Sequence, residues 1–391
     1  LPLGPTGYGD SPYQSVSTFA GNPYFIDLDT LVEEGVLDKK DCEKVNWGKK
    51  PDEVDYEKIY KGRYKLLRKA YENSNISENP DYQKFVAENS WWLSDYALFM
   101  AVKDQFGGVE WTKWAEDIRL RWANAMDYYR RELYFDIEFQ QYMQFKFYEQ
   151  WMKLKKYANE KGIQIIGDIP IYVAMDSADT WANPWLFKLD EKNCPTQVAG
   201  CPPDGFSATG QLWGNPLYRW DHHRNTGYDW WITRISWCFR LYDVVRIDHF
   251  RGFDEYFSIP AKDKTAVNGH WEKGPGIELF QAIKARLGEK PIIAEDLGYV
   301  TDTVRRMVKE SGYPNMKVIE FAFDERDTGN ASDYLPHNYP RNCVVYTGTH
   351  DNETLLSWLA DITPAERRQV RKYLNNFKDS GKELCDDLIC L

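Results

Sequence analysis

Five short apolar segments, rich in β-branched residues, constrain the fold of this 391-residue chain more than any other feature. Several are apolar almost throughout until a charged residue closes them, and helical patterns separate most neighbours, as at residues 277–288 and 301–312. Strands that are buried on both faces and alternate with helices are typical of a parallel sheet. The sequence therefore predicts an α/β fold with strands at residues 163–173, 243–250, 291–298, 316–323 and 343–351.

The remaining segments have other patterns. Residues 1–25 are rich in Gly, Pro, Ser and Tyr and are typical of a loop, with a strand end expected at Leu1–Leu3. Residues 28–162 are helical in pattern, and the best-defined helix, from about residue 137 to 160, is expected to stop at Gly162. Residues 174–230 are polar, rich in Gly, Pro and Trp, and lack a clear period, so we interpret them as a long excursion over one face.

Acidic residues fall at the ends of the predicted strands. Asp168, Asp248, Glu295 and Asp351 each lie at or near the carboxyl end of an apolar segment. Ligands and catalytic groups of parallel α/β folds occupy that face. Cleavage of a glycosidic bond needs two carboxyl groups on either side of the sugar, one ionised and one protonated. Converging carboxylates therefore indicate this chemistry.

Arg246 supports the hypothesis that these carboxylates cleave a glycosidic bond. Side chains alternate along a strand, so Arg246 and Asp248 are expected to share a face, where the guanidinium would lower the pKa of Asp248 and hold it ionised. Glu295 has no cation at the matching position, which is Ile293. If apolar neighbours cover Glu295, burial would raise its pKa towards the range of a general acid.

Each of these residues also has a structural interpretation. An acidic residue after a strand is often the N-cap of the next helix, and Asp296 is the favoured cap beside Glu295. Arg246 can be a plain structural ion pair, and Asp168 can equally be a buried hydrogen-bonding group. His249 and His350 are more often scaffold than catalytic, so they carry less weight than the carboxylates.

Composition narrows the class of partner. The net charge of −11 disfavours nucleic acid and anionic membrane surfaces. Aromatic residues make up 16% of the chain and include 16 Trp, and such rings can stack on sugars. Those within the helical pattern, including Trp91, Trp92, Trp111 and Trp114, are expected to pack in cores instead.

Cysteine and histidine usage argues against a metal site. The seven Cys contain no CxxC spacing and the six His are scattered, so we expect reduced thiols and no metal or other cofactor. The segment LPLGPTGYGDSPYQ is not a signal peptide, and the chain has no Met at position 1. We expect a cytoplasmic protein. A plastid location stays open, because the lack of an initiator Met predicts a truncated N-terminus.

Seven motifs together resemble glycoside hydrolase family 77, the 4-α-glucanotransferases known as amylomaltases or disproportionating enzymes. They are SPYQSVSTFAGNPYFIDL (11–28), GDIPIYVAMDSADTW (167–181), GQLWGNPLYRW (210–220), RIDHFRGF (246–253), GHWEKGPG (269–276), AEDLG (294–298) and GTHDNET (348–354). The resemblance implies a (β/α)₈ barrel that transfers α-1,4-glucan units with retention. It also implies that Asp248 is the nucleophile, Glu295 the acid/base, and Asp351 a group that binds sugar hydroxyls and distorts the ring.

The resemblance further implies a set of substrate-binding residues and a division of the chain. The residues are Ser11, Tyr13, Asp168, Gln211, Trp213, Arg246, His350 and Asn352. The expected parts are a strand end and substrate loop (1–27), a mostly helical insertion (28–162), a barrel strand (163–175), a loop-rich insertion over the active site (176–240), and strands and helices with the catalytic carboxylates (241–391). Since family members have barrel strands before and after these parts, we expect a fragment that lacks N-terminal strands and the last strand.

The leading hypothesis is a retaining 4-α-glucanotransferase. Its donors would be maltooligosaccharides and starch or glycogen-type α-glucans, and its acceptors glucose or oligosaccharides. The alternatives are a retaining hydrolase of the α-amylase kind, which uses the same carboxylates, and a non-catalytic glucan-binding fragment. A metal-dependent hydrolase is disfavoured because His clusters are absent from the sequence.

Overall fold

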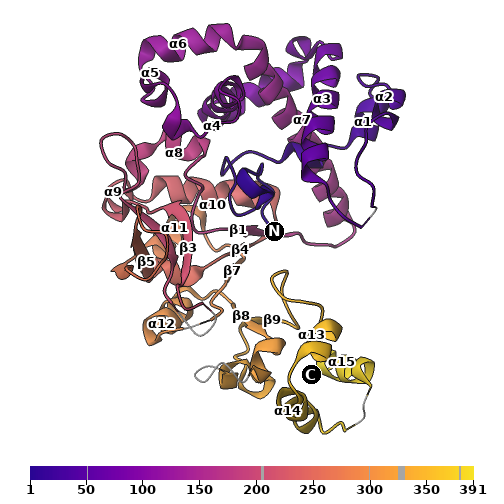
Figure 1. Cartoon of the computed structure of the whole chain (residues 1–391), viewed down its shortest axis with the longest axis vertical. Helices are drawn as coiled ribbons and strands as arrows, with labels where there is room; N and C mark the ends of the chain where they lie inside the picture. The colour runs from indigo at the N-terminus through magenta and orange to yellow at the C-terminus, as the bar shows by residue number, and fades with distance from the viewer. Residues whose placement is uncertain (51, 204–206, 299, 325–330, 378–379) are drawn as a thin grey trace.

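The computed structural model describes residues 1–50, 52–203, 207–298, 300–324, 331–377 and 380–391. The first part of the chain after residue 27 is helical, as predicted, and forms the upper part of the molecule in Figure 1. Its helices are α1 (Leu28–Glu33), α2 (Lys39–Glu43), α3 (Tyr56–Asn73), α4 (Pro80–Gln105), α5 (Glu116–Arg119), α6 (Ala123–Glu132) and α7 (Tyr134–Glu160).

The two long helices of this part begin and end where local chemistry dictates. Asn79 caps α4 by accepting hydrogen bonds from two backbone N–H groups, and Pro80 follows at the first helical position. Gly162 follows α7 with φ of 76°, a conformation that glycine adopts without strain. The predicted helix over residues 137–160 and its stop are thus confirmed.

Five parallel strands follow one another across the middle of the molecule. β1 (Ile166–Ile169), β4 (Val244–Ile247) and β7 (Ile292–Ala294) form one sheet in that order. β8 (Asn315–Val318) pairs with β9 (Cys343–Tyr346), and the N–H of Ala294 donates to the carbonyl of Pro314 at 2.9 Å, which joins β7 to β8. Helices α10 (Asp229–Leu241), α11 (Ile277–Leu287) and α12 (Asp302–Ser311) connect successive strands. The predicted α/β class is confirmed.

The strands are shorter than predicted. β8 ends at Val318, and Ile319–Phe323 is a 3₁₀ helix, η7, although the sequence from 316 to 323 is apolar enough for a strand. Leu1–Leu3 forms no strand: Pro2 and Pro5 cannot donate to a ladder, and the carbonyl of Leu3 accepts from Asn22 instead.

The excursion expected to be irregular contains regular structure. It includes the helices α8 (Ala178–Ala182) and α9 (Trp220–Asn225) and the strands β2 (Gln197–Cys201) and β3 (Gln211–Pro216). Together with β5 (Glu255–Pro260) and β6 (His270–Lys273), these strands form an antiparallel sheet in the order β3-β2-β5-β6. Gly200 lies so close to β3 that an added Cβ would meet the carbonyl oxygen of Gln211 at 2.1 Å. Small residues of this kind hide the two-residue alternation that would have predicted these strands.

The apolar core divides into two main clusters. The larger one joins the N-terminal helices to β1, β4 and β7, and the buried Trp111 and Trp114 belong to it as predicted. Trp91 differs, because half of it stays exposed although its ring packs edge-on against Phe19. The second cluster lies between η7 and the C-terminal helices α13 (Leu355–Asp361), α14 (Pro364–Leu374) and α15 (Gly381–Ile389), at the yellow end of Figure 1. Among the described helices, none is both long and apolar enough to cross a membrane.

Candidate active site

Arg246 joins two strands at their carboxyl ends. Its Nη1 lies 2.6 Å from Asp168 of β1 and 3.1 Å from Asp248, which directly follows β4. The N–H of Asp248 donates to the carbonyl of Ile169, so the ladder between the strands continues up to this residue. The predicted shared face of Arg246 and Asp248 is confirmed, and Asp168 is a buried ion-pair partner of the same guanidinium.

The predicted low pKa of Asp248 is wrong in direction. Burial raises the pKa of this carboxyl to about 6, and the nearby carboxylates of Asp168 and Asp351 add to the rise. Arg246 does lower the pKa of Asp248, but by less than burial raises it. The sequence correctly predicts that Arg246 lies beside Asp248, but it does not reveal how strongly the rest of the chain buries the Asp248 carboxyl group.

Glu295 follows β7 and is almost fully buried. Its Oε2 accepts from the N–H of His249 at 2.7 Å and its Oε1 from the N–H of Leu297 at 2.8 Å, which fixes the carboxyl group. Burial, followed by the charge of Asp248, raises the pKa of Glu295 to about 7. The predicted upward shift is confirmed, and Glu295 holds its proton to higher pH than Asp248 does.

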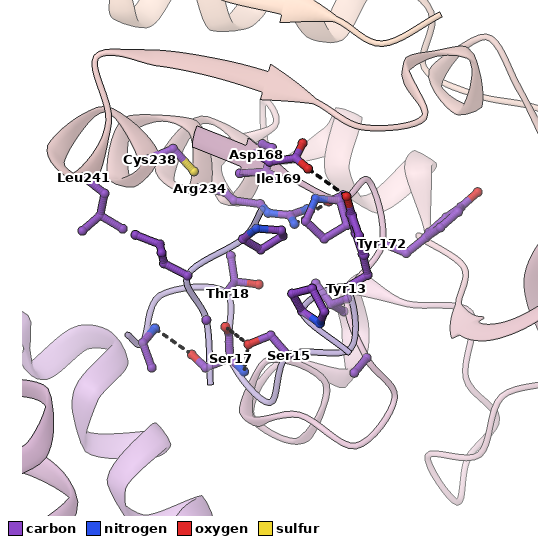
Figure 2. A pocket seen from close by; sticks show the side chains of 18 of the residues that line it. Tyr13, Ser15, Ser17, Thr18, Asp168, Ile169, Tyr172, Arg234, Cys238 and Leu241 are labelled. Carbon is purple, nitrogen blue, oxygen red and sulfur yellow. Dashed lines mark hydrogen bonds between the residues drawn. The ribbon is translucent and has the colours of Figure 1, made fainter. Parts of the chain in front are cut away.

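Tyr13 links the N-terminal loop to these groups. Its hydroxyl donates to Oδ2 of Asp168 at 3.0 Å and lies 2.6 Å from Nε2 of His350. Figure 2 shows Tyr13 and Asp168 pointing toward one another. Both residues line a small cavity, whose volume is about 50 Å³. Burial raises the pKa of Tyr13, so its hydroxyl stays protonated and keeps its role as a donor.

The loop after β9 completes a larger cavity of about 500 Å³. Asp351 and Asn352 line it together with Arg246, Asp248 and Glu295. Oδ1 of Asn352 accepts from both the N–H and the hydroxyl of Thr349, at 2.9 Å each, which closes the loop into a turn. The side chain of Asp351 is 71% exposed, so it faces an open part of the cavity.

Six predicted substrate-binding residues lie outside the lining of this cavity: Tyr13, Asp168 and His350, which are joined by the hydrogen bonds of Tyr13 beside it, and Ser11, Gln211 and Trp213. Ser11 accepts a hydrogen bond from the N–H of Tyr13 and thereby shapes the loop. Gln211 accepts from the indole N–H of Trp213 at 2.9 Å. The Trp213 ring packs edge-on against His249, with 4.9 Å between ring centroids, so β3 reaches the residue that follows Asp248.

Asp296 and His249 lie beside the two carboxyl groups. Asp296 caps no helix: it accepts from the N–H of Met316 at 3.1 Å, while Thr301 caps α12. His249 has a left-handed backbone (φ 53°), and burial lowers the pKa of its imidazole to about 3, so the ring stays neutral.

Sequence reasoning missed several residues of the cavity wall. Asp324 lines the cavity and comes directly after the predicted strand 316–323. It is therefore an acidic residue at a predicted strand end, as Asp248 and Glu295 are. The others carry no signal that distinguishes them from ordinary core or loop residues: Leu297, Gly298, Phe321, Tyr334 and Thr349. Within the described ranges, no three or more His, Cys, Asp or Glu side chains group in a way that could hold a metal ion.

Two carboxyl groups that line one cavity at the ends of parallel strands are what enzymes that cleave glycosidic bonds require. The model of glycoside hydrolase family 77, described as 4-alpha-glucanotransferase, matches residues 1–391. The chain therefore belongs to this family, and its activity is that of a 4-α-glucanotransferase, a glycosyltransferase.

Individual relatives agree with the family match. The chain is 49% identical over 384 residues to a 4-alpha-glucanotransferase of Clostridium butyricum, covering 98% of this chain and 78% of that protein. It is 48% identical over 389 residues to the 4-alpha-glucanotransferase of Thermus thermophilus, covering 98% and 76%. Its structure matches the amylomaltase from Streptococcus agalactiae in complex with acarbose with a TM-score of 0.93 and 43% identity, covering 97% of this chain and 77% of that one.

Proposed function

We propose that the chain transfers α-1,4-glucan units by a retaining mechanism in which Asp248 and Glu295 divide the work. The carboxylate of Asp248 attacks the anomeric carbon and the glycosidic C–O bond breaks, while Glu295 gives its proton to the leaving oxygen. The acceptor 4-OH then attacks the glycosyl–Asp248 ester, Glu295 takes the hydroxyl proton, and the Asp248 carboxylate is regenerated. The observation that carries this assignment is the pair of carboxyls lining one cavity, of which Glu295 holds its proton more tightly.

The residues around the pair have supporting roles in this proposal. Arg246 keeps Asp248 oriented and offsets the negative charge of Asp168. Asp351 and Asn352 bind sugar hydroxyls at the open side of the cavity. Tyr13 and His350, whose hydroxyl and Nε2 lie 2.6 Å apart, contact the same sugar from beside the cavity. Ser11, Gln211 and Trp213 act on glucan beyond the cavity, the last two from β3.

The proposed substrates are maltooligosaccharides and starch or glycogen-type α-glucans, with glucose or an oligosaccharide as acceptor. The Streptococcus agalactiae amylomaltase, whose structure this chain matches, is in complex with acarbose, which supports a saccharide as the ligand. We also propose that β1, β4, β7, β8 and β9 belong to a (β/α)₈ barrel, since each is added beside the preceding one in chain order with helices between. The boundaries 1–27, 28–162, 163–175, 176–240 and 241–391 are proposed as its parts.

Maltotriose distinguishes transfer from hydrolysis. The purified protein is incubated with maltotriose and its products are resolved by chromatography over time. Glucose together with maltopentaose and longer chains is the expected result, because a transferase passes the bound unit to another sugar. Glucose and maltose alone would indicate hydrolysis, and the absence of turnover by folded protein would contradict the mechanism.

A further inference from the structure

A second large cavity lies beside the catalytic one. It measures about 460 Å³ and is lined by α12, β8 and residues between 333 and 342. Gly298 and Tyr334 line both cavities, and the N–H of Gly298 donates to the Tyr334 hydroxyl at 3.1 Å. We call this second space the Lys317 cavity, after the buried lysine of β8 that lines it.

Lys317 is only 9% exposed, and in the described part of the chain its ammonium group makes no hydrogen bond or ion pair. Its ammonium group lies 5.1 Å from the centre of the Tyr334 ring, and its charge also acts on Asp296, where it partly offsets the rise in pKa that burial causes, without an ion pair between the two. Lysine is rarely buried without a partner, because an unpaired charge is costly to remove from water.

Two other lysines with little exposed side chain, Lys146 at 9% and Lys155 at 12%, show what Lys317 lacks. Lys146 lies 2.7 Å from Glu34 and 3.0 Å from Glu149. Lys155 lies 3.4 Å from Asp243 and also donates to backbone carbonyls. This fold therefore supplies a carboxylate to each of these ammonium groups, whereas Lys317 faces open space.

The surroundings of Lys317 also favour an anion. Arg305 and Lys309, one turn apart on α12, line the same cavity, so three cations face two carboxylates, Asp296 and Asp333. Asp333 is already paired with Arg305 at 2.9 Å, and Asp296 accepts from Asn315 and Met316. The local charge is thus 3 − 2 = +1 in a chain whose net charge is −11.

We propose that the Lys317 cavity binds a phosphate group, carried either by inorganic phosphate or by a monosaccharide phosphate ester. A phosphate offers several acceptor oxygens and negative charge, which the ammonium groups and the guanidinium match. Oδ1 of Asn315 is buried without a partner and would accept from a sugar hydroxyl of the ester. The space exceeds what a phosphate ion alone would fill, so it admits either form.

Titration calorimetry tests the proposal without turnover. Inorganic phosphate and glucose 6-phosphate are each titrated into the protein in a phosphate-free buffer at pH 7. Both are expected to bind the unaltered protein, and Lys317→Met is expected to weaken binding at least about tenfold by removing the central charge. Lys317→Arg should retain binding, and Lys264→Met, an exposed lysine of another surface, serves as the matched control.

The two ligands separate the two sources of phosphate. If glucose 6-phosphate binds more tightly, the cavity takes the ester; if both bind equally, it takes the free anion. Should Lys317→Met fail to fold, Lys309→Met is used instead and is expected to weaken binding by a smaller factor. The proposal is overturned if no phosphate binds, if all variants bind it equally, or if maltose binds in the cavity and phosphate does not.

Discussion

The two sides of the catalytic cavity differ in how firmly they are held. On the strand side, Asp168 and Arg246 are 5% and 11% exposed in their side chains and form an ion pair across β1 and β4. On the loop side, His350 and Asp351 are 32% and 71% exposed. Each side is anchored to a different apolar cluster, the strand side to the larger one and the residues after β8 to the C-terminal one.

This difference suggests a division of labour. Groups that make and break bonds must be held in fixed geometry, which strands within a packed core provide. Groups that bind sugar hydroxyls at the open side can be more exposed, because substrate must enter and leave past them. If this is correct, substitutions on the strand side should lower kcat, and those on the loop side should mainly raise KM.

Asp248→Asn should have the largest effect. An amide cannot form the glycosyl ester, so kcat for maltotriose is expected to fall by roughly 10⁴ to 10⁶-fold. Chromatography of the oligosaccharide products measures this loss. Asp263→Asn, on the loop after β5, is the control and should retain full activity. Substantial transfer by Asp248→Asn would remove this residue from the chemistry.

Arg246→Met should combine a loss of activity with a loss of stability. It leaves the buried Asp168 and the partly exposed Asp248 without their shared cation, which is expected to lower the free energy of unfolding by about 3 kcal/mol. Thermal unfolding and maltotriose kinetics measure the two effects. The control is Arg224→Met, whose exposed pair with Glu278 should contribute about 0–1 kcal/mol. Equal losses in both variants would contradict the special role of the strand side.

The pH profile of kcat/KM should be narrow. Asp248 must be ionised and Glu295 protonated for the reaction to begin. Their pKa values of about 6 and about 7 place the acid and basic limbs of the pH profile close together. Activity should therefore fall below about pH 6 and above about pH 7. In Asp351→Asn the acid limb should move to lower pH, since Asp351 raises the pKa of Asp248. A profile that stays flat to pH 9 would exclude Glu295 as the general acid.

The sequence predicted the strand side better than the loop side, for a physical reason. Strand alternation placed Arg246 beside Asp248, and strand-end position placed Glu295 near them. The pKa of Asp248 could not be predicted, because it depends on burial by segments far apart in the chain. The strands β2 and β3 were not predicted, because Gly200 and its neighbours give no alternating pattern. Lys317 looks like any other strand residue in the sequence, and only the structure shows that it lies over the Tyr334 ring without an ion pair.

Glu320 offers a test of the C-terminal cluster. It lies in η7, and burial together with the charge of Glu353 raises its pKa to about 7. A carboxyl with a higher pKa when folded than when unfolded lowers stability as pH rises from about 4.5 to about 7. Glu320→Gln should therefore be more stable than the unaltered protein at pH 8, by about 1–2 kcal/mol, and should gain only about a quarter of that at pH 5.

Thermal unfolding followed by circular dichroism at the two pH values measures this difference. Glu353→Gln is the companion variant: by removing the charge that raises the pKa of Glu320, it should give a smaller gain in the same direction at pH 8. A gain of equal size at pH 5 and pH 8 would show that packing, and not ionisation, accounts for the effect.

Asn352→Ala should have the smallest effect and tests the loop side directly. It removes two hydrogen bonds from Thr349, each contributing about 0.5–1.5 kcal/mol, in a partly exposed turn. The KM for maltotriose is expected to rise several-fold while kcat changes little, because the turn positions Asp351 for binding and the strand side stays intact. Steady-state kinetics measure both constants, with Asn342→Ala, which lies away from the catalytic cavity, as control. A fall in kcat of a hundredfold or more would mean that the exposed loop takes part in bond cleavage, and the division between the two sides of the cavity would not hold.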